Sequence, residues 1–171
     1  MNTHFRHTVE IYRDEEIFLG TLADYMSEGL LGNESCIVVA TKDHRTALFK
    51  SLEQKGLDVV HFETTGQYVA LDAATTLSHF MVNDMPSADD FKQVVGSLLP
   101  VIPTRKIRAY GEMVALLWEE GNVAAALKLE TLWNDLGKVR NFKLHCAYPH
   151  RITEKSAPVS VREIFNLHAH N

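Results

Sequence analysis

The sequence predicts a three-layer α/β domain in which a mainly parallel sheet has helices on both faces. Three observations favour this class. Short β-forming runs alternate with helical patterns along the 171 residues. Residues Ser35 to Ala40, SCIVVA, are apolar throughout, as expected of a central strand covered on both faces. The stretch Arg105 to Glu120, RKIRAYGEMVALLWEE, indicates a buried strand that runs directly into an apolar helix.

Shorter patterns predict the elements before Arg105. Further β-forming runs lie at residues 8–12, 57–62 and 68–71. The helices between the strands have apolar residues at helical spacing. Thr41 and Ser87 stand where helix N-caps are expected.

The end of the chain continues the alternation of strand and helix. Residues 125–136 have an apolar helical face, and residues 142–148, FKLHCAY, form a predicted last strand. Alternation along this strand places Cys146 on the opposite face from His145. A final helix is expected to be capped at Ser160.

Composition limits the classes of function. A net charge of -5 and a pI near 6.0, without clustered Lys and Arg, argue against direct nucleic-acid binding. No apolar run approaches the roughly 20 residues that span a bilayer. The two cysteines lie inside apolar runs, which indicates buried thiols in a reducing compartment. We therefore expect one cytoplasmic domain over residues 1–171 that does not contact a membrane.

In an open α/β sheet, ligands bind at the carboxyl ends of the strands. Within the stretch Arg105 to Glu120, Glu112 follows the buried strand and therefore lies at this edge. Two interpretations stay open at this point, since Glu112 could take part in recognition or could only cap the helix that follows it.

A phosphate-binding loop is not expected after the first strand. Such a loop needs the pattern G-x-x-x-x-G-K-[ST], whereas this place has R-D-E-E-I-F-L-G-T. The acids at positions 14–16 would repel a phosphate from the positive helix end. Nucleotide hydrolysis is therefore disfavoured.

The histidines and cysteines raise the possibilities of metal binding and thiol chemistry. His7, Cys146, His168 and His170, together with Glu112, are ligand types for zinc or a related ion, but no close-spaced motif joins them. The sequence leaves open whether a metal is bound, and we expect no cofactor. No neighbour in sequence activates Cys146 as a nucleophile, so we do not expect an enzyme.

Aromatic residues suggest an apolar pocket for a small molecule. Tyr12, Tyr110, Trp118 and Tyr148 could form its walls. Plain core packing is the competing interpretation of the same residues.

Several longer motifs resemble a known family. They are HTVEIY, EGLLGNESCIVVATKDHRTAL, GQYVALDAATTL, MPSADDF, RAYGEMVALLWEEGNVAAALKLETLWNDL and HCAYP. Together they resemble the MEDS domain, the methanogen/methylotroph DcmR sensory domain, over about residues 5–170.

The resemblance implies a RecA/KaiC-like fold without a functional P-loop and a role in sensing simple hydrocarbon derivatives. It also implies signalling partners, a histidine kinase or a transcription regulator acting in trans, and a homodimer is a further expectation. The recurrent polar positions of the family correspond here to His7, Glu112, Cys146 and His168. Phe165 stands where a cysteine is common in the family.

These observations predict a stand-alone sensory domain that binds a small, weakly polar organic ligand. The expected ligand-binding residues are His7, Tyr12, Glu112, Trp118, Cys146, Tyr148 and His168. In this prediction, His7 and Glu112 orient the polar end of the ligand. Two alternatives are a protein-interaction adaptor that binds no small molecule and a remnant nucleotide-binding protein.

Overall fold

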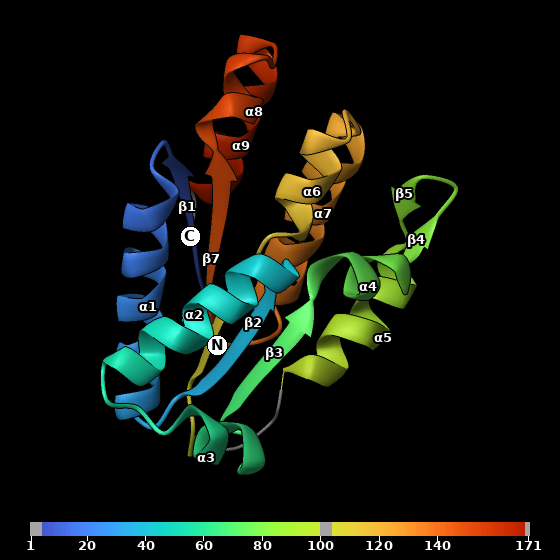
Figure 1. Cartoon of the computed structure of the whole chain (residues 1–171). Helices are drawn as coiled ribbons and strands as arrows, with labels where there is room; N and C mark the ends of the chain where they lie inside the picture. Colours follow the sequence, from blue (N-terminus) through green and yellow to red (C-terminus); the bar gives the residue numbers. More distant parts are fainter. Residues whose placement is uncertain (1–4, 100–103, 170–171) are drawn as a thin grey trace.

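The computed structural model describes residues 5–99 and 104–169, and at its centre lies a five-stranded sheet (Figure 1). All neighbouring strands of this sheet are parallel. From one edge to the other the strands are β1 (Arg6–Tyr12), β7 (Lys143–Pro149), β6 (Ile107–Gly111), β2 (Ser35–Ala40) and β3 (Tyr68–Asp72). The predicted parallel sheet is confirmed.

Helices cover both faces of the sheet, so the predicted three-layer arrangement is confirmed as well. On one face lie α1 (Glu15–Leu31), α2 (Lys42–Gln54) and α3 (Val59–Thr64). On the other lie α4 (Ala73–Ser78), α5 (Ala88–Leu98), α6 (Met113–Glu119), α7 (Val123–Gly137) and α9 (Pro158–His168). The short helix α8 (His150–Glu154) follows β7 directly. Among the described helices, none combines the length and apolar character needed to cross a membrane.

Each face of the sheet has its own hydrophobic cluster. Leu144, Cys146 and Tyr148 of β7 belong to the cluster under α6, α7 and α9. Ala147, between them, belongs to the cluster under α1 and α2. The predicted alternation along the last strand is confirmed, and it decides which layer each β7 side chain contacts.

A small antiparallel hairpin lies outside the main sheet. It consists of β4 (Met81–Val82) and β5 (Met85–Pro86). Asn83 and Asp84 between them have φ angles of 50° and 62°, a left-handed conformation that Asn and Asp tolerate better than most residues. The Asn122 side chain donates a 2.7 Å hydrogen bond to the Asp84 carbonyl and so ties the hairpin to the start of α7.

Two local predictions were wrong. Residues 57–62, predicted as a strand, contribute to helix α3, because Asp58 accepts a 3.0 Å hydrogen bond from the His61 N–H and caps a helix there. Helix α9 begins at Pro158, before the predicted cap at Ser160. Proline suits a first helical turn, where its missing N–H is not needed.

The strand order creates a topological switch point between β2 and β6. These two strands are neighbours, but the chain leaves β2 toward β3 on one side and leaves β6 toward β7 on the other. The helices that follow, α2 and α6, lie on opposite faces. A crevice at the carboxyl edge is expected at such a point. Thr41 and Glu112 follow the two strands and lie there.

Candidate functional site

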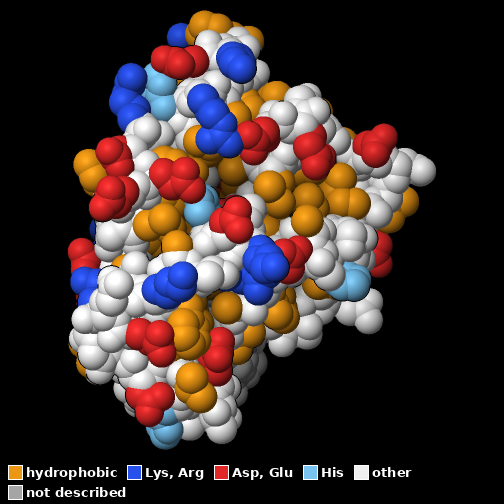
Figure 2. Space-filling view, in the orientation of Figure 1, with side chains coloured by type: hydrophobic (Ala, Val, Ile, Leu, Met, Phe, Trp, Pro, Cys, Tyr) orange, Lys and Arg blue, Asp and Glu red, His pale blue; other side chains and the backbone are white. Residues whose placement is uncertain are grey.

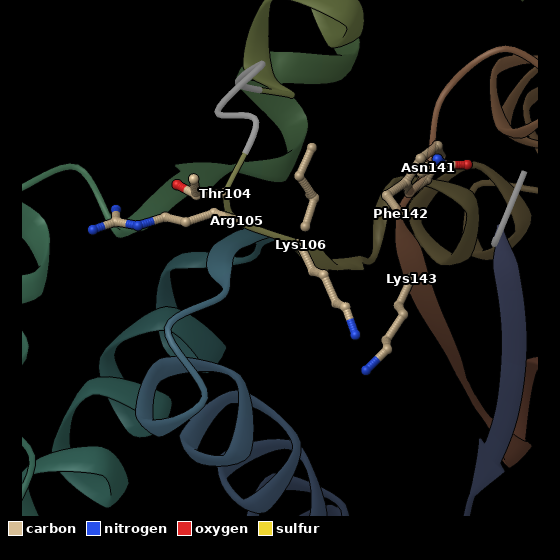
Figure 3. A pocket seen from close by; sticks show the side chains of 7 residues that line it. Thr104, Arg105, Lys106, Asn141, Phe142 and Lys143 are labelled. Atoms are coloured by element: carbon tan, nitrogen blue, oxygen red, sulfur yellow. The ribbon is translucent and has the colours of Figure 1, made fainter.

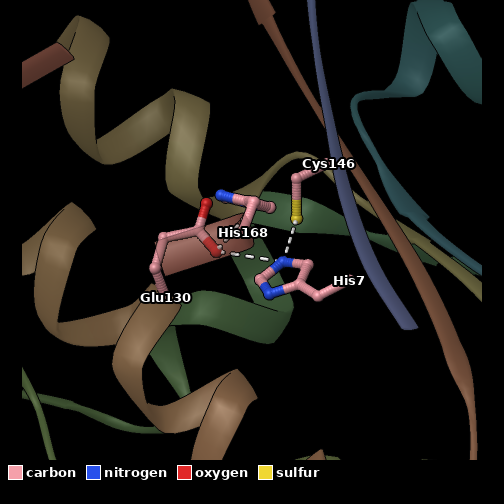
Figure 4. A group of neighbouring side chains, drawn as sticks. All are labelled: His7, Glu130, Cys146 and His168. Carbon is pink, nitrogen blue, oxygen red and sulfur yellow. Dashed lines mark hydrogen bonds and ion pairs between the residues drawn. The ribbon is translucent and has the colours of Figure 1, made fainter. Parts of the chain in front are cut away.

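Four polar side chains from four separate elements meet in the interior of the protein (Figure 4). His7 lies on β1, Glu130 on α7, Cys146 on β7 and His168 at the end of α9. All four are buried, and one potential ligand atom from each lies within 4.8 Å of the others. We call these residues the four-residue cluster. It unites three of the predicted site residues with Glu130, which the sequence analysis missed.

Local structure explains why these side chains point inward. His7 and Cys146 lie on adjacent parallel strands. Alternation places His7 on the same face as Val9, which packs against the hydrophobic cluster under α7 and α9. On α7, Glu130 is one of the buried residues, close in sequence to Trp133. The signal that could have found Glu130 is a charged residue on the apolar face of a predicted helix.

Short distances connect the members of the cluster. His7 Nε2 lies 3.3 Å from Cys146 Sγ and 3.1 Å from Glu130 Oε2. His168 Nε2 lies 3.6 Å from the same Glu130 oxygen. The other oxygen, Glu130 Oε1, accepts a 2.6 Å hydrogen bond from the Tyr148 hydroxyl. Tyr148, predicted as a wall residue, therefore holds Glu130 in place.

Hydrogen bonds on the outer side of each imidazole define its tautomer. Asn134 donates from Nδ2 to the Leu167 carbonyl at 2.8 Å, which leaves its Oδ1 to accept from His7 Nδ1 at 2.9 Å. His168 Nδ1 lies 2.7 Å from the Ile164 carbonyl and must be the donor of that hydrogen bond. When each Nδ1 carries the proton of a neutral ring, each Nε2 presents a lone pair to the cluster.

Two atoms of the cluster have no hydrogen-bond partner among the described residues. They are Glu130 Oε2 and His168 Nε2, both buried. The contact between His7 Nε2 and Glu130 Oε2 has the distance of an ion pair but lacks the alignment of a hydrogen bond. Leaving a buried polar atom unpaired costs about 1–3 kcal/mol. A cation among these atoms would remove that cost.

The protonation of the cluster suits such a cation. Burial opposes ionisation of Glu130, but its close contact with His7 holds its pKa below the usual value. Burial lowers the pKa of His168, which favours the neutral imidazole. Burial also raises the pKa of the Cys146 thiol well above its usual value, so a metal would have to displace that proton.

The donor set itself fits a metal ion of the zinc type. Two imidazole nitrogens, one thiolate sulfur and one carboxylate oxygen are all known zinc ligands, and four ligands complete a tetrahedral site. Hydrogen bonds from the outer imidazole nitrogens to an amide and a carbonyl are the usual support for histidine ligands. His170, considered as a ligand from the sequence, lies outside the described residues.

The other predicted pocket residues do not belong to the four-residue cluster. Trp118 packs edge-on against Tyr148, which supports the cluster, with ring centroids 5.7 Å apart, and donates from Nε1 to Ser156 Oγ at 2.5 Å. Tyr12 lies in the opposite layer, where it stacks on Phe18 at 4.2 Å. For these aromatic rings, core packing accounts for the contacts observed.

Glu112 belongs to a second polar group at the carboxyl edge, which we call the edge group. Its Oε2 accepts a 2.8 Å hydrogen bond from the Thr41 N–H, and its Oε1 accepts from the Tyr110 hydroxyl at 2.9 Å. His44 Nδ1 contacts the same Oε1, and His44 Nε2 lies 2.9 Å from Glu15. Glu112 therefore occupies the switch point, but it does not join His7.

The contacts of Glu112 also show whether it caps the helix that follows it. Its side chain makes no capping hydrogen bond to its own helix α6. It bonds instead to Thr41, the N-cap residue of α2. The hydrogen bond and charge of Glu112, opposed by burial and assisted by Glu15, raise the pKa of His44 to about 9. His44 is then positively charged near neutral pH.

One surface cavity lies apart from both polar groups. A cavity of about 550 Å³ at the amino end of the sheet contains none of their residues (Figure 3). It is lined by Thr104, Arg105, Lys106, Ile107, Asn141, Phe142 and Lys143. On the face shown in Figure 2, acidic and basic side chains of the described residues are mixed with one another.

The fold and the buried cluster define an α/β domain with an internal polar site. The family model of the MEDS domain, described as the methanogen/methylotroph DcmR sensory domain, matches residues 6–169. The chain therefore belongs to the MEDS family of sensory domains, and the resemblance seen in the sequence is confirmed. A comparison with the curated proteins found no match. The relation to RecA and KaiC stays a prediction.

Proposed function

We propose that this chain is a sensory domain that holds a transition-metal ion in the four-residue cluster and detects a small organic molecule there. The observation that carries the proposal is the pair of unpartnered buried atoms, Glu130 Oε2 and His168 Nε2, which face each other at 3.6 Å. Two acceptors in this position repel each other unless a cation or proton lies between them.

A metal ion explains more of the arrangement than a proton does. An extra proton on His168 would pair with Glu130, but it would leave Cys146 with only its 3.3 Å contact to His7 Nε2. A zinc-type ion would be bound by His7, Glu130, Cys146 and His168 together. It would also account for Asn134 and the Ile164 carbonyl, which turn both imidazoles toward the same point.

The first experiment is a titration of metal-free protein with Co²⁺, which substitutes for zinc and is coloured. We expect one equivalent to bind, with visible bands of a tetrahedral site and a near-ultraviolet band from thiolate to cobalt. The Cys146→Ala variant should lose the thiolate band. Cys36→Ala is the matched control, because Cys36 is also a buried free cysteine but belongs to the hydrophobic cluster on the other face.

Two results would oppose the metal assignment. One is wild-type protein that binds no Co²⁺ while its circular dichroism shows a folded chain. The other is a thiolate band that survives Cys146→Ala and disappears in Cys36→Ala.

The sensory part of the proposal concerns a small, weakly polar organic ligand and an output partner in trans, either a histidine kinase or a transcription regulator. Membership of a sensory family supports it. Thermal unfolding of the metal-loaded protein against a panel of small alcohols, thiols, amines and halogenated hydrocarbons tests it. A ligand that binds the folded state raises the melting temperature with concentration. A melting temperature unchanged across the panel would favour an adaptor instead.

A further inference from the structure

Of the two helices that supply the cluster, α9 is held by fewer buried side chains than α7. Its buried residues are Ile164 and His168, whereas Val159 and Phe165 are 62% and 47% exposed. Its N-cap position, Ala157, provides no side-chain hydrogen bond. In contrast, β1 and β7 are paired in the sheet, and α7 has eight buried residues. Opening of the structure at α9 should therefore cost less free energy than opening at the other three elements.

His168 is tied to α9 itself and moves with it. Its Nδ1 bonds to the carbonyl of Ile164 within the same helix. One link from this end of α9 to α7 is the hydrogen bond from Asn134 to the Leu167 carbonyl. Across the cluster, His168 Nε2 lies 3.6 Å from Glu130, compared with 3.1 Å for His7. The ring of His168 also contacts the ring of His7 on β1, with centroids 4.0 Å apart, but the described polar contacts of His168 are to α9 and α7.

The burial of the cluster restricts how an outside molecule could reach a metal there. All four ligand residues are buried, and their ligand atoms lie within 4.8 Å of one another. Four protein ligands complete a tetrahedral site for a zinc-type ion. An incoming molecule must therefore replace one protein ligand, and replacement is easiest at the ligand on the least firmly held element.

We propose that His168 is the exchangeable ligand of the metal site and that its exchange releases helix α9. This inference rests on the metal site of the proposed function. The incoming molecule would be a small Lewis base with a nitrogen or sulfur donor that fits the space of an imidazole ring. The bond from the metal to His168 Nε2 breaks and a bond to the incoming donor forms. Each donor keeps its own electron pair and the oxidation state of the metal does not change.

Asn134 is the positioning residue in this arrangement. Its two ends serve two ligands, because Oδ1 orients His7 and Nδ2 holds the backbone next to His168. Removing both polar atoms of the Asn134 side chain should weaken Co²⁺ binding by about 10- to 100-fold, as for other groups that orient metal ligands. Asn134→Leu tests this loss. Asn134→Asp keeps the acceptor for His7 but loses the donor to Leu167, so it should release α9 while its Co²⁺ spectrum still shows the thiolate.

Hydrogen exchange of the α9 amides is the decisive measurement. It compares metal-free protein, Co²⁺-loaded protein and Co²⁺-loaded protein with added imidazole. Metal at about 100 times its Kd should slow exchange in α9 by up to about 100-fold, because α9 can open only after His168 leaves the metal. Imidazole should remove this protection while the visible spectrum shows that cobalt remains bound. Amides of α1, which contributes no ligand, are the internal control.

The His168→Ala variant provides a second test, in which added imidazole replaces the missing side chain. It should bind Co²⁺ only weakly and recover when imidazole fills the vacated position, with α9 remaining unprotected. His7→Ala is the matched comparison. At an imidazole concentration that restores its Co²⁺ binding but is too low to displace His168 in the wild type, α9 should be protected.

The outcomes separate the two proposals. Failure of wild-type protein to bind Co²⁺ would overturn the proposed function and this inference together. Binding of Co²⁺ without any change in α9 exchange, or α9 protection that persists when imidazole enters the cobalt site, would overturn the inference alone.

Discussion

At Glu130, a carboxylate with no exposed surface keeps one hydrogen bond, from the Tyr148 hydroxyl. An ionised carboxylate in such a place is strongly disfavoured unless donors or positive charge compensate it. His7 provides part of this compensation, and the remaining oxygen faces His168 Nε2. The proposed metal would provide the rest, because a divalent charge balances a carboxylate and a thiolate together.

The variant Glu130→Gln separates metal binding from folding. The glutamine oxygen can still accept from Tyr148, and its NH₂ group can donate to an imidazole Nε2. We expect metal-free Glu130→Gln to lose little stability in urea unfolding, because the glutamine amide keeps both polar contacts. Its affinity for Co²⁺ should fall. A large loss of stability in the metal-free variant would show that the ionised Glu130 is compensated without a metal.

The edge group predicts a pH dependence through His44. Its pKa is raised to about 9 in the folded protein, above the ordinary value of 6.5. The folded state therefore binds more protons between these values, so this contribution is complete below pH 6.5 and is lost as the pH rises through 9. Urea unfolding at several pH values should show stability falling over this range.

Glu112→Gln tests the cause of that pH dependence, because Glu112 makes the largest contribution to the shift. The variant should lose about 1.5–3 kcal/mol at neutral pH, the usual value of a hydrogen bond to a charged group. Its stability should change less between pH 6.5 and 9 than that of the wild type. Its Co²⁺ spectrum should be unchanged. A changed cobalt spectrum would contradict the separation of the edge group from the cluster.

At the scale of single elements, the sequence predicts best what is decided locally. The N-caps Thr41 and Ser87 are confirmed, because each accepts a hydrogen bond from a backbone N–H three residues later. The β-branched pair in residues 57–62 favours a strand, but the helix cap at Asp58 outweighs that preference. Helix α9 begins before the predicted cap at Ser160 for a similar local reason, because Pro158 favours a helix start.

The four-residue cluster was only partly predictable, because its members are far apart along the chain. His7 and Cys146 are 139 residues apart, and their contact follows from the pairing of β1 with β7. Periodicity does not reveal that pairing. The family resemblance identified His7, Cys146 and His168, but it suggested Glu112 as the acid. Glu130, buried on α7, could be recognised only after the layers were known.

Close packing of α1 against the sheet gives a prediction at the element scale. A Cβ added at Gly29 would lie 2.7 Å from Arg108 Cδ and from Cys36 Sγ. Gly29→Ala should therefore destabilise the protein by about 1–3 kcal/mol, as overpacking of a core does. Gly20→Ala in the same helix is the control, because nothing lies within 4 Å of its added Cβ.

The expected result at Gly20 has the opposite sign. Alanine in a helix interior is more favourable than glycine by about 0.5–1 kcal/mol, so Gly20→Ala should raise stability in urea unfolding. Equal effects of the two substitutions would mean that α1 does not approach Arg108 as closely as the structure shows.

At the scale of the whole molecule, the cluster connects regions near the two ends of the sequence. His7 lies near the beginning and His168 near the end, and Glu130 and Cys146 join them to the helical layer and the sheet. A metal bound here would cross-link β1, α7, β7 and α9. In the unfolded chain these residues are far apart, so the site has no preformed counterpart there.

Metal binding should therefore raise global stability by mass action. At a free metal concentration of about 100 times Kd, the free energy of unfolding should increase by about 2.7 kcal/mol if the unfolded chain does not bind. Thermal unfolding with Zn²⁺ and with a chelator measures the difference. Cys146→Ala should show a smaller increase, and Cys36→Ala should keep the full one. An equal increase in all three proteins would mean that Zn²⁺ acts at another place, and no increase in the wild type would contradict a metal held in the cluster.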